Sequence, residues 1–174
     1  MTIRFYEASV PVFHRYLSQL SACIEIAAID CRSENIADAS IFEARLAPDM
    51  LPFKVQIEIA ANFAPRTCFP LAGLATPTNP APVASFEGLR AHIARARKLI
   101  DSIPQESFDR AGDRIIHDKA GQASLALPAA AFLLQYALPN FFFHVAVSFS
   151  LLRSIGIPIG KEDFDGYHAY ARRL

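Results

Sequence analysis

Cysteine is scarce in this sequence, and neither sign of charge is in excess. Its three cysteines, Cys23, Cys31 and Cys68, form no C-x-x-C pair and cannot all pair within one chain. This pattern excludes a disulfide-stapled scaffold and predicts free, buried thiols in a reducing cytoplasm. Lysine plus arginine and aspartate plus glutamate number 17 each, for a formal net charge of zero. A neutral chain has no general attraction to phosphate backbones, so we expect no nucleic-acid partner.

Several common signatures are also missing. The N-terminus carries charged residues where a signal peptide needs an apolar run. No HExxH, P-loop, Gly-x-Ser-x-Gly or dinucleotide-binding motif occurs. The longest apolar stretch, residues 125–152, contains two prolines as well as Gln135, Asn140 and His144. Because a membrane-spanning helix rarely carries such interruptions, the stretch predicts a buried core helix and no membrane span.

Apolar periodicity is the main signal that the sequence does contain. Hydrophobic residues make up 52% of the 174 residues, which suits one ordinary domain over 1–174. Over residues 3–31, apolar side chains recur at alternating steps of three and four, which predicts a helix packed nearly parallel to its neighbours in a bundle. Ser9 and Pro11 fit a helix start. The stripe continues upstream of them, so an earlier start with a kink at Pro11 is the alternative.

The same spacing predicts two further helices. The second opens at Pro48 and is broken by Pro65 and Pro70. A linker over residues 74–84 holds three more prolines. The third helix is capped by Ser85, and its apolar stripe covers residues 86–103.

The period changes after Arg114. Alternating apolar and polar residues on either side of residues 119–122 predict a short β-hairpin over 114–127, before the last helix. That helix is apolar nearly all round from residue 129 to 152, which predicts a central place in the bundle and a bend or break at Pro139. Gly156 ends it, and we expect the tail, residues 157–174, to be only loosely held.

The candidate chemistry lies on this last helix. Asn140 and His144 are spaced to share one face, which points toward the bundle interior. A buried histidine needs a hydrogen-bond partner, so the pair is either a satisfied core pair or the lining of a pocket. In the second case His144 is a ligand or general base, and Asn140 orients the bound molecule. The candidate partners are Asp49, which also suits the first turn of a helix, and Gln56, which also reads as a flank of the apolar stripe.

Three consecutive phenylalanines, residues 141–143, precede His144. They cover about 300° of a helix, so they cannot all face one core. At least one must point toward another helix, a second subunit or solvent. We expect a homodimer interface here, because large apolar patches on soluble proteins usually mark contacts.

Four segments carry a family resemblance: Ser9 to Phe13, Arg45 to Met50, Leu138 to His144 and Gly156 to Phe164. With them, nearly the whole chain resembles an uncharacterised bacterial and fungal family, a domain of unknown function within the DinB/YfiT-like superfamily. The resemblance implies a mainly α fold, a four-helix bundle in up-down-down-up order that is often dimeric. It also implies a pocket between helices two and four, where better-known relatives bind a divalent metal through three histidines.

The resemblance places Asn140 and His144 where those relatives carry a His-x3-His pair, and Asp49 or Gln56 where they carry the third histidine. This donor set implies no resident metal, with Zn²⁺ or Ni²⁺ on His144 and Asp49 as the alternative. Two hypotheses follow. The protein has a degenerate metal- or small-molecule-binding pocket, or it is a non-catalytic homodimeric binding or structural module. Neither hypothesis names a reaction or a substrate.

Overall fold

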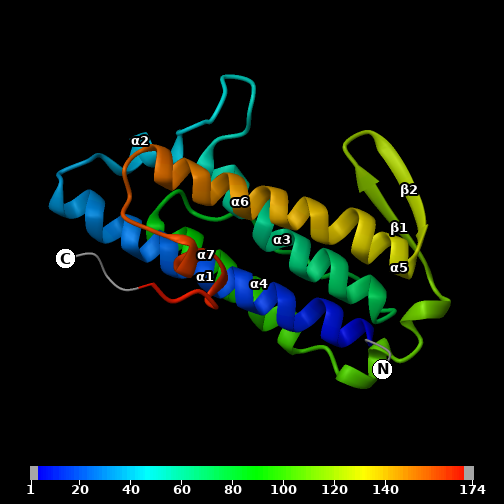
Figure 1. Ribbon diagram of the computed structural model, residues 1–174. Helices are drawn as coiled ribbons and strands as arrows, with labels where there is room; N and C mark the ends of the chain where they lie inside the picture. The colour runs from blue at the N-terminus through cyan, green and yellow to red at the C-terminus, as the bar shows by residue number, and fades with distance from the viewer. Residues whose placement is uncertain (1–3, 171–174) are drawn as a thin grey trace.

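Four long helices form the body of the molecule. The computed structural model describes residues 4–170. The long helices are α1 (Phe5–Ser33), α3 (Phe53–Leu71), α4 (Phe86–Asp101) and α6 (Leu138–Ser154). Helices α1 and α6 run in one direction, whereas α3 and α4 run in the other (Figure 1). The parallel pair α3 and α4 needs a connection that travels the length of the bundle, and residues 72–85 supply it. The up-down-down-up four-helix bundle is confirmed.

The core is built from the apolar stripes of these helices. Phe13, Phe53, Phe132 and Phe141 are almost fully buried. The rings of Phe13 and Phe141 meet edge to face, with centroids 4.8 Å apart, and such pairs stabilise a core by about 1 kcal/mol beyond area burial. The three cysteines are free and buried, as predicted. Burial raises the pKa of Cys23 to about 12, so this thiol stays protonated and unreactive.

Helix α1 begins at Phe5 and continues through Pro11, so the earlier of the two starts is the one that the structure adopts. A short helix that the sequence did not predict, α2 (Asp38–Phe42), follows it. Ile41 and Phe42 are the buried residues of this turn. Five residues are too few to show a helical period, which is why α2 was missed.

The predicted bounds of the second helix were wrong. Helix α3 begins at Phe53 rather than at Pro48, and it continues through Pro65 and Pro70. The Phe53 amide donates to the carbonyl of Ala44 (2.9 Å), so a closed loop, residues 43–52, precedes the helix. Each internal proline removes one backbone hydrogen bond. Helix α3 still continues, because it lies between α4 and α6 and its buried face packs against both.

The last helix is continuous from Ala129 to Ser154, so of the two alternatives predicted at Pro139, a bend or a break, the break is wrong. Helix α5 (Ala129–Ala131), the π-helical turn η3 (Phe132–Ala137) and α6 follow one another directly. Pro139 has no N–H to donate to the carbonyl of Gln135. The turn that precedes α6, η3, has π geometry, a rare form that occurs as single turns within α-helices.

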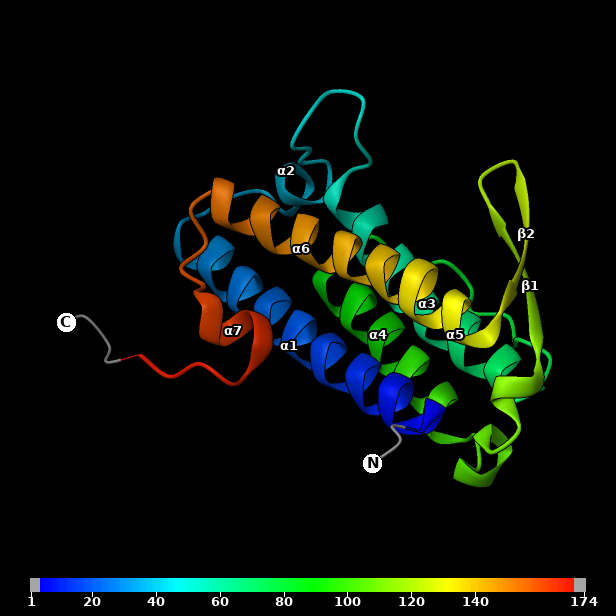
Figure 2. The same cartoon turned by 45° about the vertical axis from the view of Figure 1, so that its right-hand side comes forward.

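The predicted hairpin is confirmed. Strands β1 (Ile115–Ala120) and β2 (Ala123–Pro128) pair antiparallel, and Gly121 in the turn has a φ of 59°, which favours glycine. Two short 3₁₀ turns, η1 (Gln105–Phe108) and η2 (Ala111–Asp113), connect α4 to β1. The Arg66 Nε on α3 donates to Asp118 Oδ1 at 2.9 Å, so an ion pair fixes the hairpin to the bundle. Both views show the hairpin and loop 43–52 projecting from the same side of the bundle (Figures 1 and 2).

The tail is held more firmly than predicted. Ile157 and Ile159 are buried, and the short helix α7 (Lys161–Asp165) packs against α1. The Gln19 Nε2 donates to the carbonyl of Glu162 at 3.2 Å. These contacts correct the expectation of a loose tail for residues 157–165, whereas residues 166–170 are exposed. Residues 171–174 lie outside the described part of the chain.

Candidate functional site

Gln56 of α3 and His144 of α6 meet across the interface between these helices. The Gln56 Oε1 lies 2.6 Å from His144 Nδ1, and Gln56 is only 1% exposed. The interpretation of Gln56 as an ordinary flank of the apolar stripe was therefore wrong. Its role as a partner of His144 remained one of two interpretations, because a helical stripe in the sequence shows which face a residue occupies but not which polar atom lies opposite it on the neighbouring helix.

A chain of hydrogen bonds assigns the tautomer of His144. The Gln56 Nε2 donates to the carbonyl of Leu51 at 3.0 Å, which fixes the orientation of the amide. The amide oxygen therefore faces the imidazole, and an oxygen can only accept. Consequently Nδ1 of His144 carries the proton and donates it to Gln56. The lone pair of the imidazole is left on Nε2.

The free nitrogen of His144 faces solvent. Within residues 4–170 no group bonds to Nε2, and this nitrogen is not among the buried unpaired side-chain atoms. Burial lowers the pKa of His144, because the charged form loses its hydration. The ring is thus neutral at neutral pH, and Nε2 can accept a hydrogen bond or a proton.

Two aromatic rings border the imidazole. The Phe63 ring of α3 stacks on it, with centroids 6.0 Å apart and an interplanar angle of 26°. The exposed Phe143 ring meets it edge-on at 5.2 Å. These rings restrict the imidazole to one orientation and leave an apolar border around its open nitrogen.

The other two predicted site residues behave differently. Asn140 is half-buried on the same face as His144, and its Nδ2 donates to the carbonyl of Tyr136 at 2.7 Å. Within residues 4–170 its amide oxygen has no hydrogen-bond partner and is not among the buried unpaired side-chain atoms. Asp49 is exposed in loop 43–52, ahead of α3, so the placement of Asp49 in the first turn of that helix is wrong. In the described part of the chain, the side chain of Asp49 makes no hydrogen bond or ion pair.

The donor set does not fit a first-row metal ion. Gln56 and Asn140 supply amide groups, and the one imidazole already uses Nδ1–H toward Gln56. Zn²⁺ and Ni²⁺ prefer sites with several imidazole, thiolate or carboxylate ligands. Within residues 4–170, no group of three or more His, Cys, Asp or Glu side chains converges on one point. The side chains around His144 are therefore not suited to hold such a metal ion.

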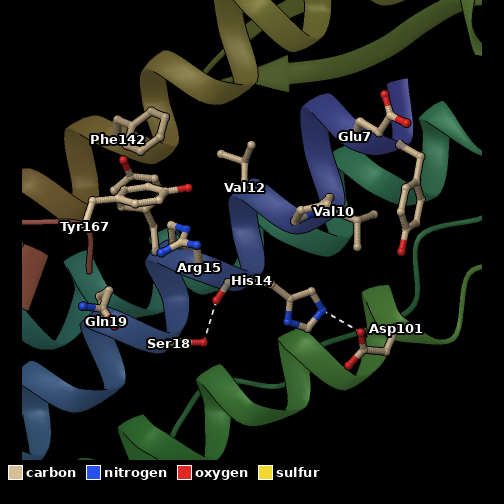
Figure 3. A pocket seen from close by; sticks show the side chains of 13 residues that line it. Glu7, Val10, Val12, His14, Arg15, Ser18, Gln19, Asp101, Phe142 and Tyr167 are labelled. Atoms are coloured by element: carbon tan, nitrogen blue, oxygen red, sulfur yellow. Dashed lines mark hydrogen bonds and ion pairs between the residues drawn. The ribbon is translucent and has the colours of Figure 1, made fainter. Parts of the chain in front are cut away.

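A cavity of about 850 Å³ lies elsewhere, along the outer face of α1. Figure 3 shows His14 reaching toward Asp101 of α4, and Arg15 lying against the ring of Tyr167. The His14 Nε2 is 2.6 Å from Asp101 Oδ1, and its Nδ1 accepts from Arg97 Nε at 3.2 Å. Both ring nitrogens of His14 are thereby engaged with α4. This histidine ties two helices together and leaves no lone pair for a ligand.

A third histidine, His92 of α4, is fully buried beneath the linker that joins α3 to α4. Its Nε2 lies 3.3 Å from Asn79 Nδ2, which also donates to Asn62 Oδ1 at 2.7 Å. Asn79 thus ties the linker to both helices. This contact could not be predicted from the sequence, because Asn79 stands among linker prolines, where an asparagine usually serves a turn.

Comparison with known proteins assigns the chain to a family and a fold. No curated protein matches it. A solved structure that does match is the crystal structure of a DinB family member protein from Shewanella denitrificans. The two share 24% sequence identity over 97% of this chain and 95% of the other, with a TM-score of 0.84, which establishes a shared fold. The model of the domain of unknown function DUF1993 matches residues 5–165. The chain therefore belongs to the DUF1993 family and has the DinB fold.

Proposed function

We propose that the surface around Gln56 and His144 binds a small molecule through the lone pair of His144 Nε2. The observation that carries this proposal is the hydrogen-bond chain from Leu51 through Gln56 to Nδ1. It holds a neutral imidazole with its accepting nitrogen outward. By contrast, both ring nitrogens of His14 bond within the bundle.

The surroundings support binding at this place. Loop 43–52 and the hairpin project on the same side of the bundle, near opposite ends of the last helix (Figures 1 and 2). They border the surface of α3 and α6 between them. Phe63 and Phe143 add apolar contact area beside the polar atom, which is the usual composition of a small-molecule site.

A fragment screen observed on the imidazole nitrogens tests the proposal. Protein labelled with ¹⁵N at histidine is mixed with a library of small polar fragments, and the long-range ¹H–¹⁵N signals are recorded. We expect some fragments to shift His144 Nε2 and to lose binding in His144→Phe. The matched control is His117→Phe, because His117 is an exposed histidine of β1. The proposal fails if the fragments that bind leave the His144 signals unchanged.

A second proposal concerns the outer face of α6 and η3. Leu134 and Phe143 are 58% and 52% exposed, and no charged residue occurs from Ala129 to Leu152. The span Ala129–Ser154 is long and apolar enough to cross a membrane. In this structure it includes one of the four long helices of the bundle. We propose that a second copy of the chain covers this face. An uncharged surface can meet its own copy without like-charge repulsion.

Light scattering at micromolar concentration tests the homodimer. Phe143→Glu should convert a dimer to a monomer, because it places a charge in an apolar contact. Val83→Glu is the matched control, since Val83 is 74% exposed in the linker. A monomeric wild-type protein would contradict the proposal.

The free, buried cysteines support a cytoplasmic location for the protein.

A further inference from the structure

We propose that the His144 site takes the head group of a primary amine in its ammonium form. This inference rests on the proposed small-molecule site and adds the chemical class of its ligand. It follows from which polar atoms the site leaves open, which charges surround it, and which rings border it.

The open polar atoms are acceptors. His144 offers the Nε2 lone pair, because Nδ1–H is bonded to Gln56. Asn140 offers its Oδ1, because its Nδ2 is bonded to the carbonyl of Tyr136. Residues four apart on a helix have Cβ atoms about 5–6 Å apart, so the two acceptors lie within reach of one small donor group. An ammonium group has three N–H donors and no acceptor, and it therefore matches this pair.

The neighbouring cations are already engaged, so an anion has no partner at the site. The guanidinium of Arg66 bonds to Asp118, to the carbonyl of Lys119 and to the Tyr136 hydroxyl. Lys54, also on α3, pairs with Glu43. A carboxylate or phosphate at His144 would face two lone pairs, whereas an ammonium group would meet two neutral acceptors, and the charge of the nearby Arg66 guanidinium is balanced by Asp118.

The aromatic border favours a cation as well. Phe63 and Phe143 both lie beside the imidazole, with ring centroids 6.0 Å and 5.2 Å from it. Phe63 is buried, stacks on His144 and already has the Arg66 guanidinium 5.3 Å from its ring centroid, so Phe143 is the ring that can offer a face to an ammonium group. The exposed Phe143 ring can also pack against the alkyl chain that carries the amine.

The site and the ligand have compatible charge states at pH 7.5. A primary alkylamine resembles the lysine side chain, with a pKa of about 10.4, so it is protonated. Burial lowers the pKa of His144, and no charged neighbour contributes to that shift. The groups of α3 that contact the ring, Gln56 and Phe63, do not titrate. Acidification therefore protonates Nε2, removes an acceptor and adds like charge.

Three probes with one alkyl chain test the ligand class: n-butylammonium, 1-butanol and butyrate. Each is titrated at pH 7.5 into protein labelled with ¹⁵N at histidine, and calorimetry measures the dissociation constant. We expect n-butylammonium to shift His144 Nε2 and to bind at least about tenfold more tightly than 1-butanol, which is the difference that one charge-assisted hydrogen bond makes. Butyrate should leave the signal unchanged.

Two perturbations make the test specific. Asn140→Ala should weaken n-butylammonium binding about tenfold, whereas Gln135→Ala, an exposed amide of the same helix, should not. In the wild type, binding should also weaken as the pH is lowered, at a lower pH than an ordinary histidine would give because burial lowers the pKa of His144, and this measurement needs no variant. If 1-butanol or butyrate shifts His144 as strongly as n-butylammonium, the ligand class is wrong although the site stands. If no probe shifts His144, both the class and the site are wrong.

Discussion

Gln56→Leu tests the hydrogen-bond chain that orients His144. The substitution keeps a similar volume but removes both amide bonds. The carbonyl of Leu51 belongs to an exposed residue and can bond to water instead. Nδ1 of His144 has no such alternative at the α3–α6 interface, whichever ring nitrogen carries the proton. Leaving one buried polar atom unpaired costs about 1 to 3 kcal/mol, so we expect Gln56→Leu to lower the free energy of unfolding by that amount.

A double-mutant cycle separates the hydrogen bond from packing. In the double variant Gln56→Leu with His144→Phe, both partners are apolar and no donor is stranded. Its free energy of unfolding should return to within about 1 kcal/mol of the wild type, with a coupling energy of about 1 kcal/mol or more. Urea unfolding followed by circular dichroism measures all four proteins, and Gln135→Leu serves as an exposed control. A loss below about 0.5 kcal/mol for Gln56→Leu, the range of ordinary surface changes, would refute the reasoning.

Three further predictions concern stability. Burial lowers the pKa of both His92 and His144, so at acidic pH the unfolded chain binds more protons than the folded protein. The free energy of unfolding should therefore decrease as the pH is lowered past about 6.5. Urea titrations at several pH values should show a shallower decrease for His144→Phe. Asn79→Leu should lower the free energy of unfolding by about 1 to 3 kcal/mol and speed amide exchange over residues 72–85. Unchanged exchange would contradict the linker contact. Phe141→Ala should cost about 3 to 5 kcal/mol, because its ring is fully buried against Phe13; a value under about 2 kcal/mol would place it outside the core.

Periodic patterns of apolar residues predicted most of the helices and the hairpin. The alternating steps of three and four in α1 and the change to an alternating pattern before the last helix are properties of single segments, so the sequence displays them directly. The resemblance of nearly the whole chain, carried by four segments, to a family within the DinB/YfiT-like superfamily then predicted the order of the helices. The comparison with the DinB family member confirms that fold.

The errors arose where tertiary packing overrides local preference. Pro65 and Pro70 are helix breakers in isolation, but α3 continues through them because it packs between α4 and α6. Pro139 suggested a bend or a break, but the helix continues through it, directly after a π turn. The tail appeared polar, yet Ile157 and Ile159 are enough to fix it against the bundle.

The candidate site was only partly readable from the sequence. Spacing placed Asn140 and His144 on one face, and the resemblance named Gln56 as one of two possible partners. It could not choose between Gln56 and Asp49, because the choice depends on where α3 begins, and the predicted start was five residues too early. The tautomer of His144 depends on the carbonyl of Leu51, a backbone group whose position no side-chain pattern reports.

The state of the His144 ring tests the central claim most directly. A long-range ¹H–¹⁵N spectrum at pH 7.5 distinguishes a protonated from an unprotonated imidazole nitrogen. The hydrogen-bond chain through Gln56 predicts a neutral ring with the proton on Nδ1 and a lone pair on Nε2. In Gln56→Leu this preference for Nδ1 should weaken. A ring protonated on Nε2, or one charged at both nitrogens, would contradict the account.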